Sequence, residues 1–126
     1  MNESRYAAAR YTLASMSLPL EANPSEVKSR IDAGDAVVLI DVREPEEFAI
    51  SKIAESELIP MRTIPQQLQH LEALADSATL IVFCHHGMRS MQVTQWLRQQ
   101  GVENCQSMAG GIDYWSTSVD PGVPRY

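Results

Sequence analysis

Two short runs of apolar residues constrain the fold more than any other feature of the sequence. Residues 36–40 and 79–83 are each nearly continuous in Val, Ile, Leu and Phe. A strand that is buried on both faces of a parallel sheet has such an unbroken apolar pattern, whereas a half-exposed strand alternates. Helical patterns separate the two runs, and this alternation is typical of α/β domains. The sequence therefore predicts a mostly parallel sheet that is covered by helices on both faces.

Helix signals and weaker strand signals fill the rest of the chain. Helices are predicted over residues 23–33, 64–74 and 90–100, another helix is predicted to start at Pro45, and a helical turn is predicted over 112–115. Asn23, Pro24 and Glu26 are typical of a capped helix start, and Gly34 is a typical helix stop. Short strands are predicted over residues 18–21, 53–59 and 102–108. Residues 1–17 have little apolar moment, so we expect a peripheral arm there and one domain over residues 18–126.

Composition and charge exclude several classes of protein. Hydrophobic residues make up 44% of the 126 residues and charged residues 21%, which is a globular composition. The net charge of -6 argues against nucleic acid and anionic lipid as partners. No apolar run approaches the roughly 18 residues of a membrane span, and no secretory signal is visible. Only Cys84 and Cys105 are present, without metal-type spacing, so a reduced, cytoplasmic protein without a metal or another cofactor is expected.

The second apolar run ends on a candidate nucleophile. Cys84 follows this strand directly, Gly87 permits a tight curl, Arg89 comes five positions after the cysteine, and Ser90 opens a helical pattern. At a helix start the backbone N–H groups lack partners and favour negative charge. The thiolate is the reactive form of cysteine. We therefore expect Cys84 to be a nucleophile in an anion-binding loop at the carboxyl edge of the sheet.

The other polar residues near this loop have both structural and functional interpretations. Arg89 offers five donors that can bind an anionic substrate, brace the loop, or do both. His85 and His86 are neighbours in the sequence, so we expect them to point to different sides, with at most one of them in the pocket. Asp41 and Arg43 end the first apolar strand and are expected to form a buried ion pair or a loop brace. Cys105 is expected to be a buried structural thiol.

Three segments in this order resemble the single-domain rhodaneses, the rhodanese-like sulfurtransferases. They are Leu39-Ile40-Asp41-Val42-Arg43-Glu44-Pro45-Glu46-Glu47-Phe48, the loop Cys84-His85-His86-Gly87-Met88-Arg89-Ser90, and Gly110-Gly111-Ile112-Asp113-Tyr114-Trp115. The resemblance covers roughly residues 18–116. It implies a three-layer α/β domain with a five-stranded, mostly parallel sheet flanked by helices.

The resemblance also implies an activity and a set of site residues. Cys84 would accept a sulfane sulfur from thiosulfate or a persulfide donor, and the Cys84 persulfide would pass it to a thiol or a sulfur-carrier protein. Residues 85–89, which are His85, His86, Gly87, Met88 and Arg89, would form the substrate-binding loop. Asp41, Arg43 and Ser90 would support it. We expect a protein that acts as a monomer.

Two alternatives remain at this point. Where the family shows Gly-His-Ile-x-Gly-Ala, this chain has Ser51-Lys52-Ile53-Ala54-Glu55-Ser56, which favours a non-catalytic binding or regulatory module. Phosphatases and arsenate reductases of the same fold have five residues between the cysteine and the arginine, which makes a wider loop. The four residues between Cys84 and Arg89 favour transfer of a single sulfur instead.

Overall fold

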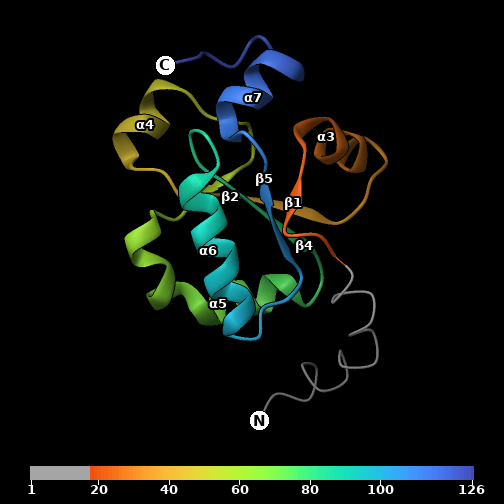
Figure 1. Ribbon diagram of the computed structural model, residues 1–126, viewed down its shortest axis with the longest axis vertical. Coiled ribbons are helices and arrows are strands. Elements are labelled where there is room, and N and C mark those ends of the chain that lie inside the picture. The colour runs from red at the N-terminus through yellow and green to blue at the C-terminus, as the bar shows by residue number, and fades with distance from the viewer. Residues whose placement is uncertain (1–17) are drawn as a thin grey trace.

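A computed structural model of the protein describes residues 18–126 and contains one five-stranded sheet (Figure 1). The strands are β1 (Glu21–Ala22), β2 (Val37–Asp41), β3 (Glu57–Leu58), β4 (Thr79–Phe83) and β5 (Cys105–Met108). All neighbouring strands are parallel, and their order is β1-β5-β4-β2-β3. This confirms the predicted fold class, because the strong apolar strands β2 and β4 are adjacent inside the sheet.

Helices cover both faces of the sheet. They are α3 (Pro24–Asp32), α4 (Pro45–Ile50), the 3₁₀ helix η2 (Met61–Gln67), α5 (Leu68–Ala75), α6 (Met88–Gln99) and α7 (Gly111–Ser118). On one face, η2, α5 and α6 bury Ile64, Leu71 and Leu97 against the sheet. On the other face, α3 and α7 bury Val27 and Trp115. The domain therefore has two apolar cores separated by the sheet.

Several element boundaries differ from the sequence prediction for local reasons. The helix expected over residues 64–74 begins as η2, which contains Pro65, and becomes α-helical at Leu68. Helix α6 begins at Met88, before Ser90, because Gly87 takes the left-handed N-cap conformation (φ 110°). The first strand is β1 (Glu21–Ala22), later than the expected residues 18–21. The predicted arm over residues 1–17 lies outside the described residues.

The strand register brings the candidate residues to one edge of the sheet. Asp41 at the end of β2 pairs with Phe83 at the end of β4, and Val42 N donates to Phe83 O (3.0 Å). In Figure 1, α4, the loop before α6, α7 and the final residues gather at this same end of the sheet. The carboxyl edge of a parallel sheet is where sites of α/β domains form. Within residues 18–126, no helix is long and apolar enough to cross a membrane.

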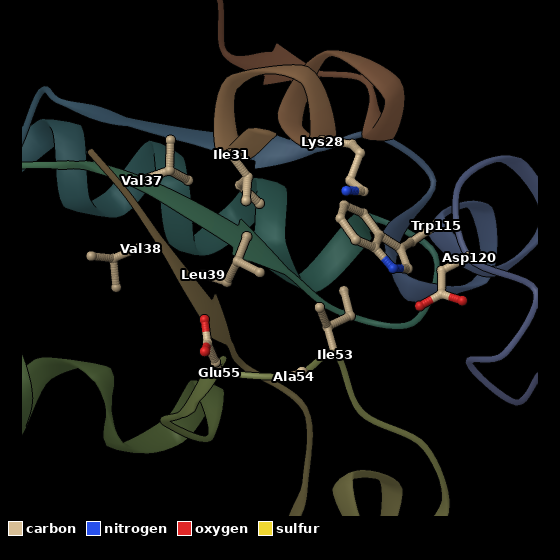
Figure 2. A pocket seen from close by; sticks show the side chains of 10 residues that line it. All are labelled: Lys28, Ile31, Val37, Val38, Leu39, Ile53, Ala54, Glu55, Trp115 and Asp120. Carbon is tan, nitrogen blue, oxygen red and sulfur yellow. The ribbon is translucent and has the colours of Figure 1, made fainter. Parts of the chain in front are cut away.

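A surface pocket of about 290 Å³ lies away from this edge (Figure 2). Its walls are mainly apolar side chains from α3, β2 and α7, including Ile31, Leu39 and Trp115. Neither Cys84 nor Arg89 lines it. This pocket, whose lining side chains Figure 2 shows, is therefore separate from the candidate nucleophile.

Candidate active site

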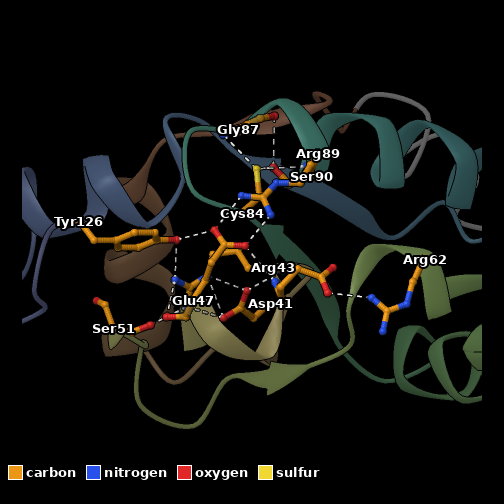
Figure 3. Close-up of polar contacts among 11 residues, drawn as sticks. Asp41, Arg43, Glu47, Ser51, Arg62, Cys84, Gly87, Arg89, Ser90 and Tyr126 are labelled. Atoms are coloured by element: carbon orange, nitrogen blue, oxygen red, sulfur yellow. Dashed lines mark hydrogen bonds and ion pairs between the residues drawn. The ribbon is translucent and has the colours of Figure 1, made fainter. Parts of the chain in front are cut away.

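The Cys84 thiol lies at the centre of the loop that joins β4 to α6 (Figure 3). The side chain is buried, and its Sγ accepts hydrogen bonds from Gly87 N (3.1 Å) and Ser90 N (3.3 Å). Both N–H groups belong to the start of α6, where helical N–H groups have no partner within the helix. The sulfur therefore lies in a cradle of backbone donors, as the sequence pattern predicted.

Helix α7 gives the loop its curled shape. Ile112 N donates to Cys84 O (2.8 Å) and Asp113 N donates to His85 O (3.1 Å). These bonds hold the carbonyl groups of the loop on α7 and leave the loop's N–H groups to the sulfur. The approach requires Gly111, because a Cβ there would lie 2.4 Å from the carbonyl oxygens of both Cys84 and His85. The third signature segment thus shapes the loop through its backbone N–H groups and the absence of a Cβ at Gly111.

Ser90 adds a hydroxyl beneath the sulfur. The Cys84 thiol donates to Ser90 Oγ (3.4 Å), and Ser90 Oγ donates to Gly87 O (3.2 Å). Ser90 Oγ also lies 2.8 Å from Ser107 Oγ on β5. Both serines are fully buried, so their hydroxyls depend on these partners. Ser90 therefore links the loop to the neighbouring strand.

Arg89 is held by a carboxylate from α4. Its guanidinium forms two parallel hydrogen bonds with Glu47, one to Oε2 (2.7 Å) and one to Oε1 (3.0 Å). This bidentate arrangement is the strongest type of arginine–carboxylate contact. The bond to Arg89 lowers the pKa of Glu47 to about 2, and the same bond raises the pKa of Arg89. Glu47 is therefore ionised at neutral pH and neutralises the charge of Arg89.

A buried ion pair lies beside this contact. Arg43 and Asp41 are both fully buried, and Arg43 Nη2 lies 2.7 Å from Asp41 Oδ2. Arg43 also donates to Ser51 O (2.6 Å) and to the Tyr126 hydroxyl (2.8 Å). Burial by itself lowers the pKa of Arg43, but the bonds to Asp41 and Tyr126 outweigh it, so the pKa is raised. The structure thus contains the ion pair expected at the end of the first strong strand.

The two histidines lie side by side, and the expectation that they point to different sides is wrong. Their rings stack with centroids 3.9 Å apart and an interplanar angle of 29°. The alternation of neighbouring side chains holds for extended strands, whereas this loop is curled by its bonds to α7. His86 is exposed, and His85 lies between it and the ring of Tyr126.

Three site residues were absent from the sequence prediction: Glu47, Ser107 and Tyr126. Glu47 caps α4 by accepting from Glu44 N (3.0 Å), in addition to holding Arg89. Its position within the first signature segment is the feature of the sequence that could have indicated a role at the site. Tyr126 follows no motif, and its hydroxyl reaches Glu47 Oε1 (2.8 Å) from the far end of the sequence. Met88, which was predicted in the loop, is 77% exposed at its rim.

Fold and site together define a parallel α/β domain that presents a cysteine in a loop of backbone donors. The sequence profile of the Rhodanese-like domain matches residues 23–118. The chain therefore belongs to the rhodanese-like family, as the three signature segments predicted.

Relatives with known names support this placement. The chain is 34% identical over 101 residues to YtwF of Bacillus subtilis, whose name assigns it provisionally to the sulfurtransferases; the match covers 80% of this chain and 94% of YtwF. It is 34% identical over 105 residues to the adenylyltransferase and sulfurtransferase MOCS3-2 of Zea mays, covering 80% of this chain. That match spans only 22% of the maize protein, so the chain corresponds to about a fifth of its length.

Solved structures show the same fold. A rhodanese-related protein of Thermoplasma volcanium superposes with a TM-score of 0.72 at 30% identity, covering 86% of this chain and 100% of that one. The human single-domain sulfurtransferase TSTD1 superposes with a TM-score of 0.68 at 28% identity, covering 80% of this chain and 98% of that one. The domain fold is thus shared along almost the whole of both solved chains.

Proposed function

We propose that the protein is a rhodanese-type sulfurtransferase that carries a sulfane sulfur on Cys84. The observation that supports this most strongly is the cradle around Sγ, in which two backbone N–H groups lie 3.1 and 3.3 Å from the sulfur. Such donors stabilise an anionic sulfur without requiring a metal or another cofactor. The free thiols of Cys84 and Cys105 suit a reducing compartment such as the cytoplasm.

In the first half-reaction the Cys84 thiolate attacks the outer sulfur of the donor. With thiosulfate, a new S–S bond forms to Cys84 and the bond between the two thiosulfate sulfurs breaks. Its electron pair leaves on sulfite, so one persulfide anion and one sulfite dianion are produced. The N–H groups of Gly87 and Ser90 are placed to bind the charged sulfur in both states, because the transferred atom lies next to the original one.

In the second half-reaction a nucleophile attacks the outer sulfur of the Cys84 persulfide. The S–S bond breaks, its electron pair returns to Cys84, and the acceptor leaves with the sulfur. Cyanide would give thiocyanate, and a thiolate of a small molecule or carrier protein would give a persulfide. Because the enzyme is modified between the two steps, we expect ping-pong kinetics.

Production of thiocyanate from thiosulfate and cyanide tests the proposal. We expect turnover with the wild-type protein and none with Cys84→Ala. Cys105→Ala is the matched control, because burial raises the pKa of this second thiol to about 11 and keeps it protonated; it should retain activity. Equal signals from wild type and Cys84→Ala would contradict a catalytic role for Cys84.

Mass spectrometry tests the half-reaction independently of the acceptor. After incubation with a sulfur donor, the intact protein should gain the mass of one sulfur atom, and peptide mapping should place it on Cys84. Hydrolysis of an aryl phosphate that is abolished by Cys84→Ser would instead favour the phosphatase alternative. Capture of a partner by wild type and Cys84→Ala alike, without any sulfur adduct, would favour the binding module.

A further inference from the structure

The segment from Val123 to Tyr126 is attached across the active-site edge at four points. Ser116 Oγ donates to Val123 O (2.5 Å) and Ser51 Oγ donates to Pro124 O (2.6 Å). Arg125 pairs with Asp113 (2.9 Å), next to the loop carbonyls held by α7. Tyr126 reaches the site itself through its ring and its hydroxyl. Ser51 is thus a part of the altered 51–56 stretch that binds this segment directly.

The ring of Tyr126 covers one face of His85. The two rings lie 3.9 Å apart and are nearly parallel, at 7°. His85 Nε2 is buried without a hydrogen-bond partner, and burial together with neighbouring His86 lowers the pKa of His85. A hydrogen bond with the Tyr126 backbone and the facing acidic groups Asp113 and Glu47 act in the opposite direction but do not reverse the shift. His85 is therefore a neutral ring at physiological pH.

The hydroxyl of Tyr126 joins the two ion pairs of the site. It accepts from Arg43 Nη1 (2.8 Å) and donates to Glu47 Oε1 (2.8 Å), the carboxylate that holds Arg89 (Figure 3). Tyr126 thus holds Glu47 through Oε1, the oxygen that also accepts from Arg89 Nη2. A dianion that needs the Arg89 guanidinium must first break a bidentate, partly buried contact.

We propose that Tyr126 is a positioning residue that selects the sulfur donor. By holding His85 and Glu47, it leaves Arg89 and Arg125 paired with carboxylates and a stack of aromatic rings beside the Cys84 loop. The site then accepts sulfur from a low-charge organic persulfide in preference to dianionic thiosulfate. The cradle of N–H groups serves the transferred sulfur of either donor, whereas the sulfonate oxygens of thiosulfate find Arg89 and Arg125 already bound to Glu47 and Asp113.

This inference rests on the proposed function and specifies its first half-reaction. The Cys84 thiolate attacks the outer sulfur of R–S–SH, the new S–S bond forms on Cys84, and the S–S bond of the donor breaks. The donor leaves as the thiolate R–S⁻ with the electron pair, and the proton stays on the transferred sulfur. The carbon group R would contact the stacked rings of Tyr126 and His85 and the exposed Met88 at the rim.

Donor competition measures the selectivity. The rate of Cys84 persulfide formation is measured with an alkyl persulfide, which carries at most one negative charge, and with dianionic thiosulfate, each divided by its rate with a free alkyl thiol in solution. Wild type should favour the persulfide, and Tyr126→Ala should reduce that preference about fivefold, as expected for one charge exposed near the sulfur. Tyr114→Ala, which removes an exposed tyrosine of α7, is the matched control and should behave as wild type.

Alkylation of Cys84 reports the charges around the thiol without any sulfur transfer. Iodoacetate and iodoacetamide differ by one negative charge, so the ratio of the iodoacetate rate to the iodoacetamide rate reports the electrostatic potential at Sγ. At pH 6 the ratio should rise about fivefold in Tyr126→Ala, because an uncovered His85 becomes protonated. In Tyr126→Phe, which keeps the ring but lacks the hydroxyl, the ratio should stay close to that of wild type.

NMR titration separates the two roles of Tyr126. The pKa of His85 should rise in Tyr126→Ala only, whereas the pKa of Glu47 should rise in both variants, since both lose the hydroxyl donor. Unchanged pKa values and an unchanged alkylation ratio in Tyr126→Ala would overturn the inference, even if the protein transfers sulfur. The expected alkylation and titration results would support the charge arrangement even if no sulfur transfer were found.

Discussion

Glu55 has a backbone conformation that its side chain does not favour. Its φ of 66° is in the left-handed region, within the turn in which Ser56 N donates to Ile53 O (3.2 Å). For a residue with a Cβ, this conformation costs about 1 kcal/mol or more of free energy. The family pattern has glycine at this position, so the altered 51–56 stretch retains the turn shape without the residue that suits it.

Replacing Glu55 by glycine should therefore stabilise the protein. The free energy gained by relieving the backbone strain exceeds the entropic cost of a more flexible unfolded chain. The free energy of unfolding should therefore rise by about 0.5 to 1 kcal/mol. Urea denaturation measures it. Ala54→Gly is the control in the same turn, and it should destabilise by a similar amount because Ala54 has no left-handed strain to relieve. A lower stability of Glu55→Gly would show that its side chain compensates for the strain.

Gly111 has a second constraint beyond its φ of 63°. Gly111→Ala must displace the carbonyls of Cys84 and His85, so we expect a loss of more than about 2 kcal/mol and of Cys84 reactivity. Gly34→Ala is the matched control, since Gly34 has a φ of 83° but nothing within 4 Å of an added Cβ. It should cost only about 1 kcal/mol. Equal costs, measured by denaturation, would argue against the close approach.

At the scale of elements, one ion pair connects α4 to the loop between β4 and α6. Glu47 on α4 has a pKa of about 2, against an ordinary value of 4.5. A lowered pKa means that the carboxylate stabilises the folded state fully above pH 4.5. This contribution is lost as the pH falls toward 2, where Glu47 becomes protonated.

The pH dependence of stability tests this connection. Glu47→Gln should destabilise the protein by about 2 kcal/mol at pH 7, and the difference from wild type should vanish as the pH approaches 2. Glu46→Gln, on the same turn but exposed, should show little difference at any pH. Urea unfolding at several pH values gives both profiles, and a difference for Glu47→Gln that is independent of pH would contradict the ion pair.

Element prediction succeeded where the signal was local. The unbroken apolar pattern identified β2 and β4, and Asn23 correctly marked the start of α3 by accepting from Glu26 N (2.8 Å). Strands β1 and β3 have two residues each, which is too short for periodicity, and they exist because neighbouring strands offer partners. The 3₁₀ geometry of η2 likewise depends on tertiary packing around Ile64.

At the scale of the molecule, the negative net charge disfavours the approach of dianionic sulfur donors. The net charge of -6 repels a dianion such as thiosulfate, and salt screens that repulsion. We expect the rate of Cys84 modification by thiosulfate to rise roughly twofold between low and physiological ionic strength. An alkyl persulfide, which carries at most one negative charge, is the control, and its rate should depend less on salt. A thiosulfate rate that falls with added salt would indicate a local cationic site that overcomes the overall charge.

Long-range contacts limited what the sequence could reveal about the site. The order of signature segments placed Cys84, Gly87, Arg89 and Ser90 in one loop, because these residues are close in the chain. Tyr126 bonds Arg43 and Glu47 across 83 and 79 positions. No periodicity or spacing connects such distant residues, and only the path of the folded chain brings them together.

The Cys84 loop depends on hydrogen bonds from α7, which comes later in the chain. The carbonyls of Cys84 and His85 are turned by N–H groups of Ile112 and Asp113, which the ribosome adds almost thirty residues later. A nascent chain that ends before residue 112 lacks the partners of these two carbonyls. The loop around Cys84 therefore has its full set of hydrogen bonds only after residues 112 and 113 have been synthesised.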